Sequence, residues 1–481
     1  MNPRVGESER WTPVPGNHWD LLPAPTAPHP DVPEVSVVVP YYRDQAGLDL
    51  LLAALTRQEM PGGRLQVVIA DDGSPEPPRL PARPPFDLQV IRQPDLGFRA
   101  SAARALGASV AEGQVLAFLD GDMIPDRHYL RHAVHRAARS PEAVVVGRRR
   151  HLDPARLAAR WQPGDPVPEE AVLDEPAWLE RAYASTGNLL EADSTAYRFM
   201  ISAVLTVHRH IHDDAGGFDP DFVGYGGEDW EFAHRLWRAG ALLAHEPRAE
   251  AWHRGPDFAG REDLQAGRTV KNRESLVLAR KVSAPTARGW SWGSRTRPRV
   301  EVVLECSADG DVSLPGMVLC ADAMVQSFPA ARLLLPGPVP ADAEVLLEDP
   351  RVCVRAAPAG ASPNPDPVST PDPGEAADLA AVPDWTITVL APIRPARGAG
   401  PPDPAAAAEW LLEAERAGHD RIEVSGPAGL AVTAVSSRAL WRARRWGHRD
   451  PSGVVGLDLA DCGWEPAGED TDLEAWWGGW G

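Results

Sequence analysis

Cysteine is scarce in this chain of 481 residues, and its four cysteines all lie in the second half. No two of them have the short spacing of a zinc site, and four are too few for a dense disulfide framework in a chain of this length. We therefore expect buried, reduced thiols in a cytoplasmic protein at Cys306, Cys320, Cys353 and Cys462.

Long hydrophobic runs are also absent. A membrane-spanning helix needs about 20 consecutive apolar residues, and no segment of the sequence approaches this length. The first residues lack the charged segment and apolar core of a signal peptide. The sequence thus predicts neither a membrane span nor a signal peptide.

Positive charge is in short supply, because 48 basic residues face 68 acidic ones and the formal net charge is -20. A general nucleic-acid binder needs many cations to displace counterions from phosphates, so this class of function is excluded. A phosphate-bearing ligand would need local help from a metal ion, a few arginines, or backbone amides at a helix N-terminus.

The length of the chain predicts more than one domain, since a single core stops growing at about 250 to 300 residues. Residues 1–33 are rich in proline and polar residues and predict an extended arm. We place the first domain at 34–285, a linker at 286–299 and a second domain at 300–481. Within the second domain, the proline-rich stretch 355–373 predicts a flexible insertion.

Strand and helix patterns alternate in the first 125 residues, which is typical of a doubly wound α/β fold with a mostly parallel sheet. Leucines at positions 48, 51, 52 and 55 have helical spacing, and residues 101–111 are rich in alanine. The apolar runs that predict strands are Val35–Val39, Leu65–Ala70, Phe86–Arg92 and Val115–Leu119.

Acidic residues follow two of these strands, at the edge where such sheets bind ligands. Asp120 and Asp122 flank a glycine directly after the strand at 115–119. Mg²⁺ and Mn²⁺ prefer carboxylate oxygens, so we interpret this motif as a metal site rather than a simple turn. His253 is a candidate third ligand that would suit Mn²⁺, although a lone histidine is more often structural.

A second acidic cluster, Glu228 and Asp229, follows two glycines and precedes a helical pattern at Phe232–Arg238. The positive end of a helix favours carboxylates in its first turn. A carboxylate within reach of a hydroxyl group can act as a general base, which typically contributes about 10²–10⁴ in rate. The preceding glycines favour this catalytic role over a plain helix cap.

The second half of the chain repeats pieces of the first in the same order, which indicates a duplicated architecture rather than a chance likeness. In the second copy, Pro336-Gly337-Pro338 and Ala391-Pro392-Ile393 stand where the first has its aspartates, so we expect no catalysis there. The matched pieces are 300–304 with 35–39, 331–338 with 65–74, 384–392 with 115–122, 430–438 with 200–209, and 456–461 and 468–470 with 217–221 and 227–229.

Five motifs occur in order between residues 35 and 254: VSVVVPYYRD, VVIADDGS, LGFRASAARALG, LAFLDGDMIP and GGFDPDFVGYGGEDWEFAHRL. Together they resemble glycosyltransferase family 2 of the GT-A fold. The last motif is similar to the C-terminal motif of β-1,4-galactosyltransferases and bacterial chondroitin polymerases. The resemblance implies a Rossmann-like GT-A catalytic domain followed by a degenerate GT-A-like domain. It also implies inverting, metal-dependent hexosyl transfer from a nucleotide sugar, with a UDP-sugar favoured, to a hydroxyl acceptor.

The resemblance also assigns roles to individual residues. It implies a nucleotide pocket that begins at Pro40 and Tyr42, with Asp72, alone or with Asp71, bound to the base. Arg99 would help to neutralise the diphosphate. The remaining implied roles are a ribose or sugar contact at Asp120, metal ligation at Asp122 and His253, a sugar contact at Glu228 and the catalytic base at Asp229. Two positions depart from the family pattern, Arg43 and Ala105, where asparagine is frequent.

Two other classes of function remain open on the sequence. One is a non-catalytic scaffold that binds nucleotides or carbohydrates. The other is a nucleotidyltransferase, although no glycine-rich loop with a lysine lies near the first strand. The acceptor is a glycan, a lipid or a small molecule, and a lipid-linked acceptor would be met at the membrane surface. The second domain could serve as an oligomer surface, as an acceptor platform or as packing for the first domain. Four tryptophans lie near its end and form either an exposed surface or part of its core: Trp464, Trp476, Trp477 and Trp480.

Overall fold

The chain forms two compact units, Met1–Leu278 and Ala279–Gly481, in a computed structural model. The division falls inside helix α7 (Leu264–Lys281), slightly before the linker expected at 286–299. The residues that the structure describes are 11–23, 34–60, 64–224, 226–256, 264–289, 293–294, 297–305, 314–339, 341–355, 382–396, 404–468 and 472–474.

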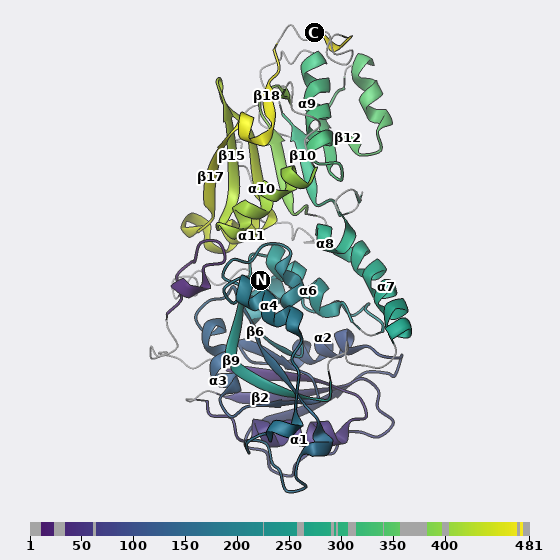
Figure 1. Ribbon diagram of the computed structural model, residues 1–481, viewed down its shortest axis with the longest axis vertical. Helices are drawn as coiled ribbons and strands as arrows, with labels where there is room; N and C mark the ends of the chain where they lie inside the picture. Colours follow the sequence, from purple (N-terminus) through teal and green to yellow (C-terminus); the bar gives the residue numbers. More distant parts are fainter. Residues whose placement is uncertain are drawn as a thin grey trace. The chain divides into compact units, whose positions relative to one another are not determined.

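The first unit is built on a nine-stranded sheet with the order β3-β2-β1-β4-β8-β6-β9-β5, to which β7 adds beside β6 (Figure 1). Strands β1 to β4 are parallel, β8 is antiparallel to both of its neighbours, and β6 and β9 are parallel. The predicted α/β class is therefore confirmed. The strands are β1 Val35–Tyr41, β2 Leu65–Asp71, β3 Asp87–Arg92, β4 Val115–Leu119, β5 Met123–Pro125, β6 Ala143–Leu152, β7 Val172–Leu173, β8 Val204–His208 and β9 Leu242–Arg254.

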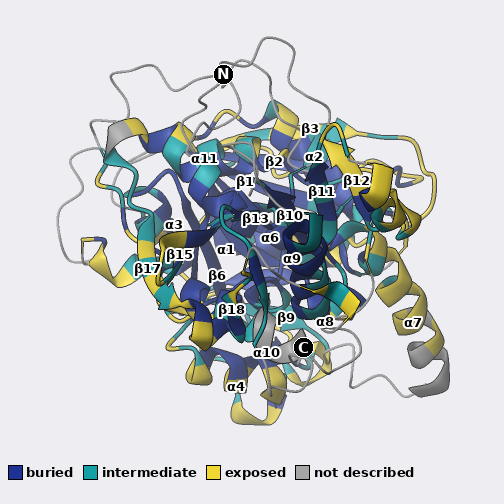
Figure 2. Cartoon of the chain, turned by 90° about the horizontal axis from the view of Figure 1, so that it is seen from above, coloured by how far each residue is buried: buried dark blue, intermediate teal, exposed yellow. Residues whose placement is uncertain are grey.

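The helices of the first unit cover this sheet with apolar faces. In α1, the four leucines at helical spacing are all buried, and the carboxylate of Asp44 caps the helix by accepting from the Gly47 N–H. Strand β4 is buried at every residue because it lies in the middle of the sheet. Figure 2 draws buried residues in dark blue, and β1, the neighbour of β4, is buried at all but one residue. The helices are α1 Gln45–Leu55, α2 Ala100–Val110, α3 Tyr129–Ala137, α4 Ala177–Ser185, α5 Arg209–Asp214, α6 Glu228–Arg238 and α7.

The described part of the N-terminal segment, residues 11–23, is docked on the first unit and is not a free arm. Val14 and Leu22 are buried against Leu242. The side chain of Asn17 donates to the carbonyl oxygen of Leu243 at 2.9 Å and accepts from the N–H of the same residue at 2.8 Å. This pair of bonds completes the edge of β9 in the manner of an added strand residue.

The second unit has a seven-stranded sheet with the order β12-β11-β10-β13-β16-β15-β17, and a separate pair β14-β18. Position by position, this order and every strand direction match β3-β2-β1-β4-β8-β6-β9 of the first unit. The strands are β10 Val300–Leu304, β11 Arg332–Pro336, β12 Val352–Arg355, β13 Trp385–Val389, β14 Ile393–Pro395, β15 His419–Gly426, β16 Gly429–Ser436, β17 Gly453–Asp458 and β18 Trp464–Pro466. The helices are α8 Pro285–Arg288, α9 Leu314–Ser327, α10 Pro404–Arg416 and α11 Ser437–Trp446.

One of the matched pieces in the predicted repeat is wrong. Gly456 to Asp458 belong to β17, whose place in the sheet is that of β9, whereas 217–221 form the loop before α6. The described residues between α11 and β17 hold no counterpart of α6. The counterpart of the Asp-Gly-Asp motif lies between β13 and β14, at 390–392, one residue before the expected position. Residues 469 and 470 lie outside the described part of the chain.

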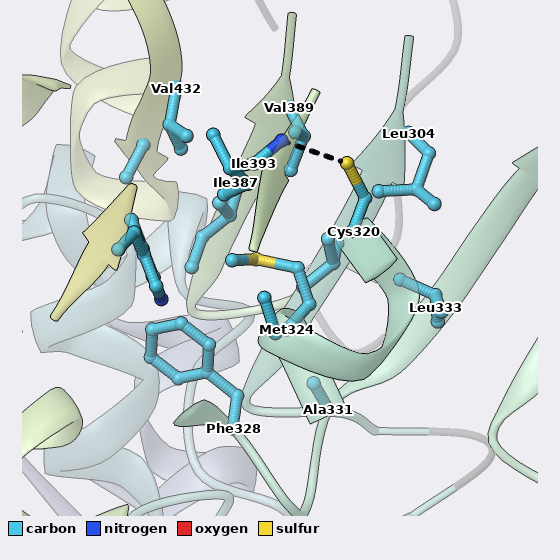
Figure 3. Close-up of a cluster of buried hydrophobic side chains, with 14 of the residues drawn as sticks. Leu304, Cys320, Met324, Phe328, Ala331, Leu333, Ile387, Val389, Ile393 and Val432 are labelled. Atoms are coloured by element: carbon cyan, nitrogen blue, oxygen red, sulfur yellow. Dashed lines mark hydrogen bonds between the residues drawn. The ribbon is translucent and has the colours of Figure 1, made fainter. Parts of the chain in front are cut away.

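The core of the second unit explains two of its cysteines and one tryptophan. Cys320 is buried among apolar side chains, and its sulfur accepts from the N–H of Ile393 at 3.2 Å (Figure 3). Cys462 is buried, and burial raises the pKa of its thiol to about 12. Trp464 is buried and donates to Ser327. Cys353, however, is exposed, so the expectation of burial is wrong there.

The remaining expectations for the second half concern residues that the structure does not describe. Cys306, Trp476, Trp477, Trp480 and the stretch 356–373 lie outside the described residues. No helix in the described part of the chain is both long and apolar enough to cross a membrane.

Candidate active site

Asp122 and His253 meet at the carboxyl-end edge of the first sheet. The short strand β5 follows the Asp-Gly-Asp turn and pairs with the end of β9, which sets Met123 opposite His253. As a result, the Nε2 atom of His253 lies 3.2 Å from Oδ2 of Asp122. The other ring nitrogen, Nδ1, is 3.0 Å from the carbonyl oxygen of Gly255. The Nδ1–H group of His253 donates to the Gly255 carbonyl oxygen. Nε2 is then the ring nitrogen that faces the Asp122 carboxylate.

The Asp122–His253 pair fits a divalent cation. Oδ1 of Asp122 is buried and has no hydrogen-bond partner in the described structure, which is costly unless another group binds it. Burial opposes the charge on Asp122, but the hydrogen bond and the charge of His253 outweigh it and hold the pKa of Asp122 below its usual range. Conversely, burial opposes protonation of His253, but Asp122 raises its pKa.

The described residues contain no group of three side chains arranged as metal ligands. Asp120, the other candidate ligand, accepts a hydrogen bond from Arg104 through its Oδ1 atom. A cation bound to Asp122 and His253 would therefore take its remaining ligands from water or from a bound phosphate.

Arg104 connects the two acidic motifs, and the sequence had given it no role. Its guanidinium group is buried, and Nη2 lies 2.6 Å from Oδ1 of Asp120 while Nη1 lies 2.9 Å from Oε1 of Glu228. The ring of Phe218 lies 5.4 Å from the guanidinium carbon. Burial disfavours its charge, but the two carboxylates raise the pKa of Arg104, so the cation is permanent. The Asp-Gly-Asp turn and the start of α6 thus lie on either side of one guanidinium group.

Glycines shape the approach to α6. Gly226 and Gly227 have φ angles of 93° and 91°, a region that other residues seldom adopt. A Cβ atom on Gly226 would lie 2.8 Å from the carboxylate of Glu274, which comes from α7. The two glycines therefore let the chain turn under α7 and present Glu228 and Asp229 in the first turn of α6.

Asp229 is the acid in this turn with the strongest perturbation. Its carboxylate is partly buried and accepts from the N–H of Trp230 at 2.9 Å. Burial, and then the negative charge of Glu228, raise the pKa of Asp229 to about 7, although Arg104 opposes the shift. A carboxyl group with this pKa can exchange a proton near neutral pH, as a general base requires.

The predicted nucleotide residues lie along the ends of β1 and β2. Asp72 is buried, and its carboxylate accepts from the Arg99 N–H at 2.8 Å and from Gln93 at 2.6 Å. The hydroxyl group of Tyr42 donates to Asp95 at 3.1 Å, and the Tyr42 ring is exposed. Asp72, Arg99 and Tyr42 are thus brought to one surface, together with Gln93 and Asp95, which the sequence had not singled out.

Asp71 and Pro40 support this surface from below. Asp71 is fully buried, and its carboxylate accepts from the Ser74 N–H at 2.8 Å, which fixes the turn after β2. The carbonyl oxygen of Pro40 lies 3.3 Å from the position that a Cβ atom on Gly121 would take. Glycine at this position lets the Asp-Gly-Asp turn pack against the end of β1.

The comparisons with known proteins match the same part of the chain. Residues 36–199 match the model of glycosyl transferase family 2, and residues 193–249 match a model described as the N-terminal domain of galactosyltransferase. The chain is 27% identical over 255 residues to a chondroitin synthase of Pasteurella multocida (strain Pm70), covering 49% of this chain and 26% of that protein. It is 34% identical over 227 residues to a validoxylamine A glucosyltransferase of Streptomyces hygroscopicus subsp. limoneus, covering 43% and 48%.

The chain thus spans about a quarter to a half of the length of these curated relatives. A solved mannosyltransferase from Pyrobaculum calidifontis, in complex with GDP-Man and Mn²⁺, aligns with 59% of this chain and 72% of its own, at 18% identity and a TM-score of 0.38. Both family matches fall on the mixed sheet of the first unit. The first match includes the Asp-Gly-Asp turn, and the second includes α6. Within the first unit, residues 36–199 are therefore similar to family 2 glycosyltransferases, and residues 193–249 are similar to a galactosyltransferase domain.

Proposed function

We propose that this chain is a metal-dependent, inverting glycosyltransferase that moves a hexosyl group from a nucleotide sugar, with UDP-sugars as the favoured class, to a hydroxyl acceptor. One observation supports the proposal most strongly. Arg104 donates to Asp120 and to Glu228, so the two acidic motifs that donor and acceptor would need lie at one place. If Asp120 only formed a turn and Glu228 only capped a helix, the two carboxylates would not need to share the buried guanidinium group of Arg104.

Asp229 is the proposed general base. Its raised pKa allows it to take a proton from the acceptor hydroxyl group near neutral pH. The oxygen then attacks the anomeric carbon from the face opposite the nucleoside diphosphate, and one displacement inverts the configuration there. Glu228, held by Arg104, would orient a sugar hydroxyl group.

Asp122 and His253 are the proposed protein ligands of the cation. The unpartnered Oδ1 of Asp122 and the Nε2 of His253 would bind it, and the Gly255 carbonyl oxygen would hold the imidazole ring in the required orientation. When bound, Mn²⁺ or Mg²⁺ would neutralise the negative charge of the leaving diphosphate. Tyr42, Asp72 and Arg99 would hold the nucleotide beside it.

The second unit is proposed to be a degenerate copy of the first without catalytic activity. The support for this is the matching strand order and the Leu390-Ala391-Pro392 turn, which stands where the first unit has Asp120-Gly121-Asp122. Its role in acceptor binding or assembly is a separate question that the catalytic tests leave untouched.

The test is a donor screen on the whole chain. Hydrolysis of UDP-, GDP- and dTDP-sugars, with and without Mn²⁺, is expected to reveal metal-dependent release of one nucleoside diphosphate. Asp229→Asn should abolish turnover and leave donor binding, measured by calorimetry, nearly unchanged. The matched control is Asp87→Asn. Asp87 is the exposed first residue of β3, at the end of the strand away from the site, and this variant should behave like the wild type. Turnover by Asp229→Asn at the wild-type rate would overturn the assignment of the base.

A further inference from the structure

Glu274 of helix α7 lies against the glycine turn that leads into α6, within the first unit. A Cβ atom on Gly226 would lie 2.8 Å from Cδ and from both carboxylate oxygens of Glu274. A Cβ atom on Gly227 would lie 3.3 Å from Cγ of Glu274 and 3.3 Å from Cγ of Leu278. Residues four apart on a helix share a face, so Glu274 and Leu278 together form the surface that covers the turn.

The carboxylate group of Glu274 is largely buried in this position. Its side chain is 8% exposed, and Oε2 accepts from Nζ of Lys271 at 2.8 Å. The side chain of Lys271 is 48% exposed, so water screens its charge. A buried carboxylate opposes folding unless strong partners compensate its lost hydration, and an apolar side chain would fill the same space without this loss. The position of Glu274 therefore indicates a role for its charge.

Three charged side chains from three helices act on the carboxyl group of Asp229. Glu228 precedes it in α6, Arg104 comes from α2 and Glu274 comes from α7. Burial and the charge of Glu228 are the larger causes of the raised pKa of Asp229, and the charge of Glu274 adds to them. Arg104 opposes the shift, but its guanidinium group is bonded to Glu228 and Asp120. Glu274 thus adds a second negative charge close to Asp229, from a helix outside both acidic motifs.

The charged groups of the other elements that pack against α6 are engaged locally. The short 3-10 helix Ala196–Phe199 carries Arg198, which donates to the carbonyl oxygen and the hydroxyl group of Thr195. In α5, Nδ1 of His212 lies 2.9 Å from Oδ1 of Asp213. Among the described residues, α7 therefore supplies a charge beside the proposed base that can be altered without changing either acidic motif.

We propose that Glu274 is a positioning residue for the general base. Its carboxylate holds the Gly226–Gly227 turn in place and supplies a negative charge beside Asp229, which keeps this carboxyl group a good proton acceptor. The inference rests on the proposed function, because it deepens the role of Asp229. Glu274 lies beyond residues 36–199 and 193–249, which the family models match, so the comparisons assign it no role.

The first test is the pH profile of kcat/KM, measured by hydrolysis of the nucleotide sugar that the donor screen selects. Glu274→Gln keeps the shape of the side chain and removes its charge, so the rising limb should move to lower pH by about half a unit or more. The plateau should fall, since a weaker base takes the proton less readily. Glu274→Asp restores the charge and should return the limb close to its wild-type position. Asp87→Asn, which removes the same charge from an exposed strand end, is the matched control and should leave the limb in place.

The second test is independent of turnover. The whole protein is labelled with ¹³C at the side-chain carboxyl group of aspartate, and Asp229→Asn identifies the signal of Asp229. The titration midpoint of this signal should be lower in Glu274→Gln than in the wild type. Lys271→Gln leaves Glu274 in place without its cation, so at low ionic strength the midpoint should move to higher pH. A role in packing alone predicts a change in the urea midpoint of these variants and no movement of the signal.

The outcomes separate this inference from the proposed function. An unmoved midpoint in Glu274→Gln, or a lower midpoint in Lys271→Gln, would overturn the inference whatever the activity. A shifted midpoint with an unmoved kinetic limb would also overturn it, because another group would then be the base. A shifted midpoint in a protein that turns over no nucleotide sugar would support the action of Glu274 on Asp229 and contradict the proposed function.

Discussion

Nε2 of His253 lies 3.2 Å from Oδ2 of Asp122, and this contact joins the turn after β4 to the end of β9. A hydrogen bond across this contact requires a proton on Nε2 of His253. A cation would take the place of that proton, so metal binding and protonation compete at this pair.

The first prediction concerns this competition. Treatment with EDTA should remove transferase activity, and Mn²⁺ should restore it. Because Asp122 raises the pKa of His253, the Mn²⁺ concentration for half-maximal activity should fall as the pH rises through that pKa. His253→Ala should raise this concentration at least about tenfold. Full activity in EDTA would contradict the metal site.

The second prediction concerns the buried Arg104. Arg104→Ala leaves Asp120 and Glu228 without their shared cation and should destabilise the first unit by about 3–5 kcal/mol, as measured by urea denaturation. The matched control is Arg64→Ala, which removes an exposed partner of Asp87 and should leave the urea midpoint nearly unchanged, because exposed ion pairs contribute little to stability. An equal loss of stability in the two variants would show that the buried Arg104 stabilises the first unit no more than an exposed ion pair does.

The third prediction is the pH profile of catalysis. Since Asp229 must be ionised to accept a proton and its pKa is about 7, kcat/KM should rise with pH and level off above this value. Glu228→Gln removes the neighbouring negative charge that raises this pKa, so the rising limb should move to lower pH. A limb that stays in place would mean that another group controls the profile.

The fourth prediction is a stability profile that mirrors catalysis. In the unfolded chain an aspartate titrates at about 3.9, whereas folded Asp229 holds its proton up to about pH 7. The folded state therefore binds more protons in this window, and the contribution of Asp229 to stability falls as the pH rises from about 4 to 7. Asp229→Asn cannot titrate, so it should gain stability relative to the wild type as the pH is raised. Thermal denaturation at pH 4 and pH 8 tests this, and a constant difference between the two proteins would contradict it.

The sequence predicted the sheet well because buried parallel strands need apolar side chains on both faces. Val35–Val39 and Val115–Leu119 carry that pattern without interruption, and both are strands in the structure. Asp122 and His253 were predicted as metal ligands from the residues after the strand at 115–119 and again from the family resemblance, and the antiparallel pairing of β5 with β9 brings them together.

The sequence did not predict two other features of the structure. Arg104 is one arginine in an alanine-rich helix, and its two partners come from other elements of the fold. Val14 and Leu22 are isolated apolar residues in a proline-rich segment, so their docking against Leu242 depends on a surface that the sequence alone does not reveal. The mistaken repeat at Gly456 arose because a glycine followed by an acid marks turns and strand ends alike.

The matching order of the two sheets provides a built-in comparison within one chain. Where the first unit has Asp120-Gly121-Asp122, the second joins the equivalent strands with Leu390-Ala391-Pro392. Pro466 takes the register of His253, since it pairs with the first residue of β14 as His253 pairs with the first residue of β5. An equivalent sheet therefore forms without a carboxylate or an imidazole group at these strand ends. Architecture does not demand these groups in the first unit, and this supports their proposed role in binding a ligand.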